Sequence, residues 1–545
     1  MPTKLANTKL ATEKLLAWVL LPIFVFAFSQ STLSGQETIG TQKDLPQHAS
    51  WRVGEFGDAE DSTPSRQGIY RIKYSPDGKF LATRNKRNVV TVYDLKTHAM
   101  ICEVEGHEDW IETIDFSPNG EFFVTASGDG DKVKIWKTQT GALESEIETL
   151  GIAAFFDKNG KQINVLGETH VESYSWPGVQ RTRQRKWQGN NSATAKHMSR
   201  DGRYVVAFRA LNRPFYQSLL IDTESKSRVP LAGATAVPRT VKISADNKWV
   251  AATYHREPKV RLWEIGNSKN TRYTLAGHED TVQSLSFSAD NRFLVSSGWD
   301  KNVFVWDLLT RQSINNFKGH NGHVNATAFA PFGFAFATGA SGLKDCSMIT
   351  WDMKEVLFDK AYSPDKESDL SVDEQFEPIW KSLGTSSLKL SIKATSKLAA
   401  GGDYFLGSLE KKVQSDISLN RSVTTETYIK QLDSPDYALR DQATRALLKM
   451  VKEVEARLRN ELKQTTSPEV KYRISMILKS EPPRGKSDLV LTRRWYRIIL
   501  ALEQINTERS QAILKLASQG HRSSEIALHA AQSYRRNVKR AKLTE

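Results

Sequence analysis

The sequence predicts an all-β ring of seven four-stranded units, followed by an all-α domain. Three observations lead to this prediction. A phrase of about a dozen residues recurs seven times, at spacings of 39 to 45 residues. Each recurrence contains short segments in which apolar and polar residues alternate, as in half-buried strands. Beyond residue 362 the apolar spacing becomes helical, and 545 residues are too many for one ordinary domain.

The N-terminus is predicted to be a signal peptide, residues 1–29. Three lysines (Lys4, Lys9 and Lys14) precede a fourteen-residue apolar run, and Ala27 and Ser29 have the spacing of a cleavage site. The run, residues 15–28, is shorter than the roughly 20 residues that span a bilayer. We therefore expect an exported protein, periplasmic or secreted, with no membrane span after signal removal. An inner-membrane anchor through residues 15–28 is the alternative.

The repeats begin after a predicted disordered linker, residues 30–49. The phrase FSPNGEFFVTASG at Phe116 recurs as FSADNRFLVSSG at Phe287, and looser copies start at Tyr74, Phe155, Met198, Ile243 and Phe329. In each copy a strand such as VQSLSF ends at a turn rich in Ser, Asp, Asn and Gly, and strands such as FLVSS, VFVWD and SINNFKG follow. Seven such units should close into a ring of blades, which leaves few exposed sheet edges.

Three copies carry a more specific pattern, with Gly-His at the start and Trp or Trp-Asp at the end. They span residues 106–137, 277–307 and 319–352. This pattern resembles the WD40 family over roughly residues 50–362, and the resemblance implies a seven-bladed β-propeller. Blades 1, 3, 4 and 5 depart from the pattern, so six or eight blades are the alternatives.

The resemblance also implies a buried hydrogen-bonded network of His, Ser or Thr, Asp and Trp within a blade. Blade 6 offers His278, Ser296, Asp300 and Trp306; blade 2 offers His107, Thr125, Asp129 and Trp136; blade 7 offers His320, Thr338, Asp345 and Trp351. A hydrolase needs one Ser-His-Asp set, whereas a propeller can use one network per blade. The sequence contains no G-x-S-x-G motif that would expose a nucleophile. We therefore expect no catalytic residues here.

By the same resemblance, two positions in each blade point to the face that binds partners. One position lies three residues after the His and the other just before the Asp; together they give Trp110, Thr281, His323, Trp299 and Lys344. Large aromatic residues anchor protein interfaces, so Trp110 and Trp299 lead this predicted binding rim. The alternative is that each Trp lies flat over its own hairpin.

Other site signals are weak. No metal site is expected, because His320 of HNGH belongs to the network and the remaining ligands of a calcium loop are missing around GDGDK. RTRQRKW, residues 181–187, is interpreted as a solvated basic loop, so we expect no nucleic-acid partner. No cofactor is expected. Cys102 and Cys346 are interpreted as free thiols, although export permits a disulfide.

A polar linker, residues 363–372, leads to a predicted α-helical domain, residues 373–545. In EQFEPIWKSL the apolar residues share one helix face, and further helical segments end at glycines or begin at Ser-Pro. The segment LDSPDYALRDQATRALLKMV resembles the opening pair of a HEAT-like repeat. Propellers joined to such helical tails occur in exported bacterial proteins.

These features together predict a non-enzymatic scaffold that mediates protein–protein interactions outside the cytoplasm. The formal charge of +14 favours acidic partners. Two alternatives remain: a propeller with a ligand or catalytic site in its central channel, and a membrane-tethered regulatory or assembly protein.

Overall fold

The computed structural model describes residues 49–53, 68–127, 132–187, 193–211, 216–234, 236–266, 272–342, 345–358, 362–418, 425–449, 451–479, 486–520 and 524–544. The predicted signal peptide lies outside these residues. The chain divides into two compact units, one ending at Met353 and the other beginning at Lys354. The predicted limits of the domains and linkers stay predictions. No helix among the described residues is long and apolar enough to cross a membrane.

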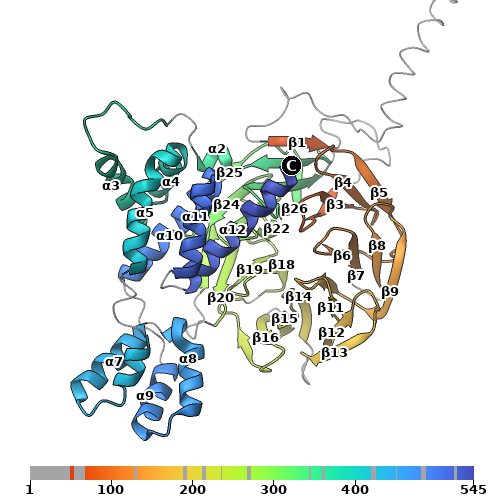
Figure 1. Ribbon diagram of the computed structural model, residues 1–545. Helices are drawn as coiled ribbons and strands as arrows, with labels where there is room; N and C mark the ends of the chain where they lie inside the picture. The colour runs from red at the N-terminus through yellow and green to blue at the C-terminus, as the bar shows by residue number, and fades with distance from the viewer. Residues whose placement is uncertain are drawn as a thin grey trace, which may run out of the picture. The chain divides into compact units, whose positions relative to one another are not determined.

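The first unit is a ring of seven four-stranded antiparallel sheets, which confirms the seven-bladed β-propeller (Figure 1). Six blades use four consecutive strands. Blade 1 has β2 (Ile69–Tyr74), β3 (Phe80–Asn85), β4 (Val90–Asp94) and β5 (Met100–Val104); blade 2 has β6 (Ile111–Phe116), β7 (Phe122–Ser127), β8 (Lys132–Lys137) and β9 (Leu143–Leu150); blade 3 has β10 (Ala153–Phe156), β11 (Gln162–Leu166), β12 (His170–Ser175) and β13 (Arg181–Lys186).

Blades 4 to 6 follow the same order. Blade 4 has β14 (Ala193–Met198), β15 (Tyr204–Ala210), β16 (Tyr216–Asp222) and β17 (Arg228–Pro230); blade 5 has β18 (Pro238–Ile243), β19 (Trp249–Tyr254), β20 (Lys259–Glu264) and β21 (Arg272–Ala276); blade 6 has β22 (Val282–Phe287), β23 (Phe293–Gly298), β24 (Val303–Asp307) and β25 (Gln312–Phe317).

Blade 7 closes the ring with strands from both ends of the propeller. It contains β26 (His323–Phe329), β27 (Ala335–Ser341) and β28 (Met348–Asp352), and its outer strand is β1 (Ala49–Val53). β1 pairs antiparallel with β28 from Ala49 opposite Trp351 to Val53 opposite Met348. The N-terminal and C-terminal ends of the propeller are therefore hydrogen-bonded to each other.

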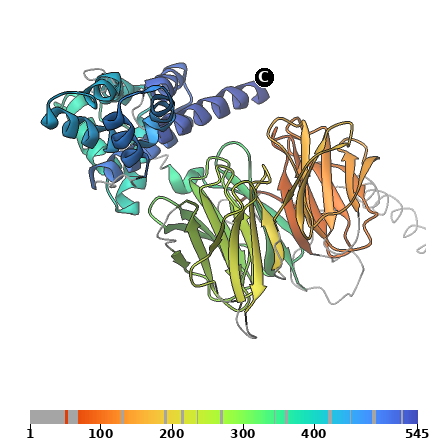
Figure 2. The ribbon, with the colours of Figure 1, turned by 90° about the horizontal axis from the view of Figure 1, so that it is seen from below.

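The first strand of every blade lies innermost, and the inner strands of neighbouring blades contact one another around the ring. Figure 1 shows the sheets arranged about a common axis, with β6, β14, β18, β22 and β26 toward the middle and β5, β9 and β13 at the circumference, and Figure 2 shows the sheets from the side. Apolar side chains pack between adjacent blades, as Val124 of blade 2 and Phe156 of blade 3 do in one buried cluster.

The turn between the first and second strands has the same structure in five blades, and this explains the recurring phrase. A Ser hydroxyl donates to an Asp or Asn two residues later, at 2.5–2.7 Å in the pairs Ser75–Asp77, Ser117–Asn119, Ser199–Asp201, Ser244–Asp246 and Ser288–Asp290. The residue directly after this Asp or Asn, such as Gly120 or Asn291, has a positive φ, which Gly and Asn adopt most easily.

The basic cluster RTRQRKW corrects one prediction: it is not a loop. Its first six residues form β13, the outer strand of blade 3, with Arg185 buried and its neighbours exposed. An outer strand buries few side chains, so its sequence lacks the apolar alternation of an inner strand. Charged residues on such an edge also discourage pairing with another chain.

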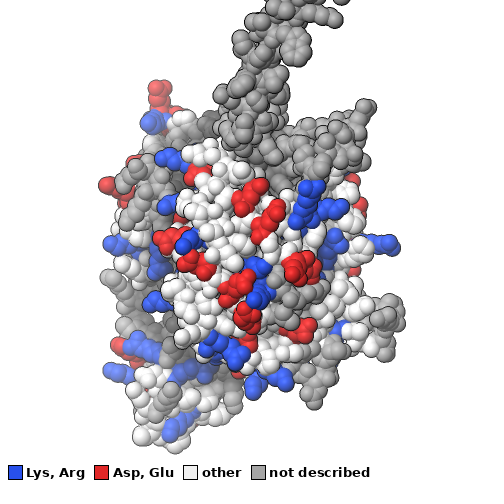
Figure 3. All heavy atoms as spheres, turned by 90° about the vertical axis from the view of Figure 1, so that its right-hand side faces the viewer, with Lys and Arg blue, Asp and Glu red and all other residues white. Residues whose placement is uncertain are grey.

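Figure 3 shows charges of both signs interspersed on the side where Figure 1 places β5, β8 and β9.

The second unit contains eleven helices among its described residues. They are α2 (Lys354–Leu357), α3 (Val372–Leu383), α4 (Leu388–Gly401), α5 (Asp403–Ser418), α6 (Thr425–Gln431), α7 (Tyr437–Lys449), α8 (Val451–Gln464), α9 (Pro468–Lys479), α10 (Lys486–Ile505), α11 (Glu508–Gly520) and α12 (Ser524–Thr544). The α-helical prediction is confirmed. As expected from its spacing, α3 buries Phe376, Ile379, Trp380 and Leu383, and Ser371 with Glu374 forms a capping box at its start.

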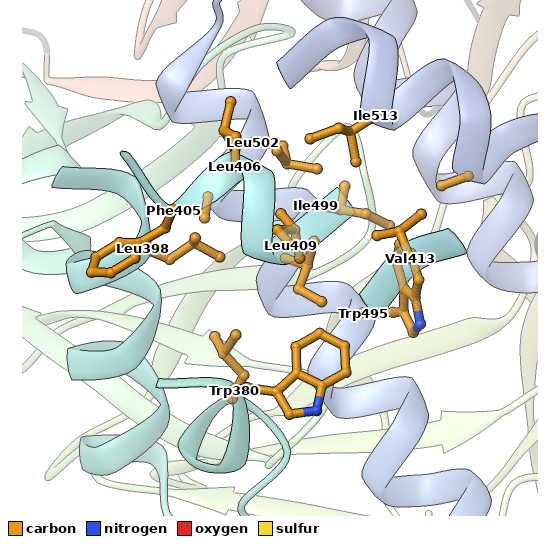
Figure 4. Packing of buried hydrophobic residues seen from close by; sticks show 14 of the residues in the cluster. Trp380, Leu398, Phe405, Leu406, Leu409, Val413, Trp495, Ile499, Leu502 and Ile513 are labelled. Carbon is orange, nitrogen blue, oxygen red and sulfur yellow. The ribbon is translucent and has the colours of Figure 1, made fainter. Parts of the chain in front are cut away.

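The helical unit has two separate hydrophobic cores. One joins α3, α4, α5, α10, α11 and α12 around side chains such as Leu409, Trp495 and Leu502 (Figure 4). The other joins α6 to α9 around Leu432, Leu447 and Ile474. α7 lies within residues 432–451, the segment for which a HEAT-like repeat was predicted, and that resemblance stays a prediction.

Candidate functional site

The candidate site is built from two parts of the propeller: the polar networks inside the blades and the side chains at one end of the ring. In blade 6 the indole N–H of Trp306 donates to the Ser296 hydroxyl, 2.8 Å from it. The same hydroxyl lies 2.8 Å from Nε2 of His278, and Nδ1 of His278 lies 2.8 Å from the Asp300 carboxylate. With Nδ1–H donating to the carboxylate, Nε2 accepts from the hydroxyl, so every polar atom in the chain is paired.

Blades 7 and 2 repeat this arrangement. In blade 7, Trp351 donates to Thr338 at 2.7 Å, and His320 contacts Thr338 at 2.8 Å and Asp345 at 2.9 Å. In blade 2, Trp136 and His107 lie 2.8 and 2.6 Å from the Thr125 hydroxyl. Asp129, the expected fourth member, lies outside the described residues.

These hydroxyls are not available to a substrate. Ser296, Thr125 and Thr338 are all fully buried, and the Trp ring that covers each one is at most 6% exposed. An attacking oxygen must reach a substrate carbonyl, which a buried hydroxyl beneath an indole does not. The three Ser/Thr-His sets therefore hold the blades together.

The blades that lack the motif satisfy their polar groups differently. The strand register places Tyr93, Tyr174, Ile221 and Trp263 at the positions of the network Trp. Tyr174 donates to the buried carboxylate of Glu172 at 2.6 Å, and this carboxylate also accepts from Thr149, Arg181 and Gln184. Trp263 donates to the Ala232 carbonyl instead of to Thr253. The Glu172 centre has no counterpart in the motif, and sequence reasoning missed it.

The predicted binding rim divides into separate groups. Trp299, in the turn between β23 and β24, stacks on His323 with ring centroids 5.5 Å apart, and His255 meets its edge at 6.2 Å. The guanidinium of Arg239 lies 5.2 Å from the Trp299 ring. These four side chains, which we call the aromatic surface, come from blades 5, 6 and 7, and all but the half-buried Trp299 are exposed. His255 and Arg239 were not among the predicted rim residues.

Trp110 is not part of the aromatic surface: it is half-buried against two residues of blade 1. Its ring stacks over the guanidinium of Arg84, 4.1 Å away, and meets Tyr70 edge-on at 5.5 Å. This contact differs from the predicted alternative, in which the ring lies over its own hairpin, because Arg84 and Tyr70 belong to blade 1.

Thr281 requires a correction, and Lys344 lies outside the described residues. Thr281 is only 1% exposed, so it presents no side chain to a partner. Its carbonyl accepts a hydrogen bond from the Trp299 backbone at 3.0 Å, so the Trp299 turn folds over this residue.

A third group lies on the inner strands. The next-to-last residues of the seven strands occupy equivalent register positions: Lys73, Asp115, Phe155, His197, Lys242, Ser286 and Ala328. Asp115 is fully buried and receives Lys73 at 2.9 Å and Arg200 at 2.5 Å. Lys73 and Arg200 come from blades 1 and 4, so Asp115 joins blades that are not neighbours.

Burial and neighbouring positive charges lower the pKa of two residues of this group. The pKa of Lys242 is lowered to about 8, first by burial and then by Arg71 and Lys73. Burial, Lys242 and Lys73 hold the pKa of His197 well below its usual value. Among the described residues, no three His, Cys, Asp or Glu side chains are arranged to hold a metal ion. Cys102 and Cys346 are free thiols.

Comparison with known proteins identifies the repeats. The family described as "WD domain, G-beta repeat" matches residues 99–137, 269–307 and 311–352. This confirms WD40 repeats in blades 2, 6 and 7, which are the blades with the complete sequence motif.

Curated relatives match over short stretches. The small ribosomal subunit protein RACK1 of Drosophila melanogaster is 38% identical over 81 residues, 14% of this chain and 24% of that protein. MST50-interacting protein 11 of Pyricularia oryzae is 38% identical over 93 residues, 17% of this chain and 28% of that protein. The chain thus spans about a quarter of the length of these relatives. Among solved structures, the β-propeller domain of Cps50 (Swd1) from Myceliophteria thermophila aligns with a TM-score of 0.43 at 15% identity, covering 52% of this chain and 96% of that chain.

Proposed function

We propose that this protein, a WD40-repeat β-propeller joined to a helical domain, is a non-enzymatic scaffold that binds a protein partner through its aromatic surface. One observation carries the proposal. Trp299, His323, His255 and Arg239 gather from three successive blades at one end of the ring, in mutual ring and cation–π contact. Interface centres are enriched in Trp and Arg, and His323 and His255 extend the same surface.

The chemistry of this surface favours an acidic partner. Arg239 is exposed, and its guanidinium is held in place by a 2.5 Å hydrogen bond to Gln283. A fixed guanidinium beside an indole can pair with a carboxylate while the ring packs against the partner's apolar atoms. The formal charge of +14 adds long-range attraction for acidic surfaces.

Two further points support a scaffold over an enzyme. WD40 propellers generally act as non-catalytic interaction platforms, and one relative is named for its interaction with another protein. The two complete Ser/Thr-His-Asp sets described above, in blades 6 and 7, have fully buried hydroxyls. A rigid ring of seven sheets also holds the aromatic surface in a fixed geometry, which lowers the entropic cost of association.

The test is partner capture with a Trp299→Ala variant. Wild-type protein is crosslinked in the envelope fraction, and the captured proteins are compared with those captured by the variant. We expect the variant to lose the partner, with a binding loss of about 2 kcal/mol or more for a central Trp. Unchanged melting temperature shows that the propeller is still folded.

The matched control is Trp249→Ala. Trp249 is also a half-buried Trp in aromatic contact, with Tyr273 at 6.1 Å, but it begins a second strand and so lies at the opposite end of its blade. This control should capture the same proteins as wild type. Equal capture by the Trp299→Ala variant would place the partner surface elsewhere.

Export is a second part of the proposal and rests on residues 4–29 of the sequence, outside the described residues. N-terminal sequencing of protein recovered from cells should find a chain that begins near Gln30. A chain that begins at Met1, found in the membrane fraction, would support the tethered alternative instead.

A further inference from the structure

The charges on the inner strands are unequal. These seven strands contain five basic residues (Arg71, Lys73, Lys196, Arg239 and Lys242) and two acidic ones (Glu112 and Asp115). The outer side of the propeller seen in Figure 3 mixes both signs instead. An excess of cations around an axis attracts anions, because neighbouring strands concentrate the same sign of charge in a small volume.

Both carboxylates are already neutralised by partners in the protein. Glu112 accepts from Arg71. Asp115 binds Lys73 and Arg200 and also accepts from the Phe156 backbone at 3.0 Å. Lys242, by contrast, has no hydrogen bond or ion pair with any described residue. One half-buried ammonium is therefore left without a counterion inside the protein.

The basic groups act on one another across the ring. Lys242 belongs to blade 5, whereas Arg71 and Lys73 belong to blade 1, yet their repulsion lowers the Lys242 pKa. Glu112 and Asp115 oppose this effect without cancelling it. His197 of blade 4 is also within range of Lys73 and Lys242. The ion pairs of Asp115 with Lys73 at 2.9 Å and Arg200 at 2.5 Å bring blades 1, 2 and 4 together in this region, and Lys242 of blade 5 occupies the equivalent register position of its inner strand.

A second cation in this neighbourhood is incompletely satisfied. Arg84 is fully buried, and its Nε and Nη2 atoms have no hydrogen-bond partner among the described residues. Its pKa is lowered to about 9 by burial and then by Arg71. Arg84 is satisfied only in part, by the Trp110 ring and the Asn85 carbonyl. Incompletely paired buried cations such as Arg84 and Lys242 destabilise a fold, and a bound anion would offset part of this cost.

We propose that Lys242 and Lys73, with Arg71 nearby, form a binding site for a phosphoryl group, borne by a small molecule or by a peptide. A dianionic phosphoryl group has three acceptor oxygens and can contact several ammonium groups at once, whereas a single carboxylate neutralises one charge. Lysine binds phosphate as a compact point charge. The two lysines are not members of the aromatic surface, although Arg71 lies within electrostatic range of Arg239, and the proposal does not depend on the proposed scaffold function.

The test is calorimetric titration of the full chain at pH 7 and constant ionic strength, with two probes. One probe is pyrophosphate and the other is a phosphoserine peptide, with its unphosphorylated form as a control. We expect saturable binding of at least one phosphorylated probe, and the probe that binds identifies the source. Lys242→Met should weaken binding roughly ten- to a hundredfold, as expected when one charge-assisted contact is lost.

The matched control is Lys259→Met, because Lys259 is an exposed lysine of the same blade. This variant and Trp299→Ala should bind the probes as tightly as wild type. Lys242→Gln provides a second uncharged side chain, and both Lys242 variants should melt no lower than wild type because they remove a desolvated cation. Equal affinity in the Lys242 and Lys259 variants, or no binding of either probe at millimolar concentration, would overturn the proposal.

The pH dependence gives an independent readout. Lys242 must be protonated to bind, and its free-state pKa is about 8, so wild-type affinity should fall above pH 8 by up to about tenfold per pH unit. A phosphoserine probe is already dianionic there, since its second pKa is about 6. The charged groups that act on Lys242 are Arg71, Lys73, Glu112 and Asp115. The pKa of His197 is held well below its usual value by burial, so His197 stays neutral in this range. The residual affinity of the Lys242→Met variant for the probe should not decrease above pH 8.

Discussion

At Ser296 a single hydroxyl satisfies two buried ring nitrogens at once, one from Trp306 and one from His278. The motif allowed this set to be found from the sequence because its members have fixed spacings within one blade. The Glu172 centre of blade 3 could not be found in this way. Its partners come from four positions with no repeated spacing, and only the fold brings them together.

Trp306→Phe should lower the free energy of unfolding by about 1–3 kcal/mol, because the Ser296 oxygen loses its indole donor while it remains buried. Urea denaturation of the propeller measures this loss. In the double variant with Ser296→Ala, both partners are gone, so the combined loss should be smaller than the sum of the single losses. Strict additivity would show that the two groups do not interact.

The carboxylates of blades 6 and 7 predict how stability responds to acid. Burial raises the pKa of both Asp300 and Asp345, but hydrogen bonds from His278, His320 and neighbouring groups outweigh it, so both pKa values lie below the ordinary value. A lowered pKa adds stability above the unfolded-state pKa of about 3.9, and this stability is lost as pH falls through the folded-state pKa. Asp345→Asn should therefore flatten the fall in unfolding free energy below pH 4. An acid limb as steep as that of wild type would contradict this assignment.

At the scale of elements, the period of the repeat predicted the blades because every blade uses a similar turn and a similar alternation of buried and exposed residues. It did not predict β1, the outer strand of blade 7. β1 has only five residues, and its partner β28 lies about 300 residues away in sequence. α5 was also missed, although Leu406, Leu409 and Val413 recur at helical spacing and are fully buried. Its exposed face carries charged residues, which lower the mean hydropathy of the segment and make the apolar stripe harder to recognise in the sequence.

Trp51 of β1 should be essential to ring closure. It is 4% exposed, stacks on His98 of blade 1 at 4.3 Å and meets Tyr93 edge-on at 5.9 Å, so it joins blade 7 to blade 1. Trp51→Ala should cost about 3–5 kcal/mol of unfolding free energy, since it leaves a large cavity at the closure. The half-buried Trp249 is the comparison, and its replacement by Ala should cost less. A smaller loss at Trp51 than at Trp249 would contradict closure by β1.

At the scale of the whole molecule, each of the two units is stabilised by apolar packing of its own. The propeller is stabilised by apolar clusters between blades, and the helical unit by two cores of its own. The sequence indicated this division through the change in apolar period. The convergence of Lys73, Asp115 and Lys242 could not be predicted, because each lies in a different repeat and only ring closure brings them together.

Separate cores predict that the two units unfold separately. Calorimetry of the full chain should show at least two transitions, and a substitution in one unit should shift only the transitions of that unit. Leu502→Ala removes a fully buried side chain of the helical core and should lower a helical transition by about 2–5 kcal/mol in stability. Trp51→Ala should instead lower the propeller transition. A single transition that both substitutions shift by similar amounts would mean that the units fold as one cooperative body, and the scaffold would then present one rigid surface rather than two.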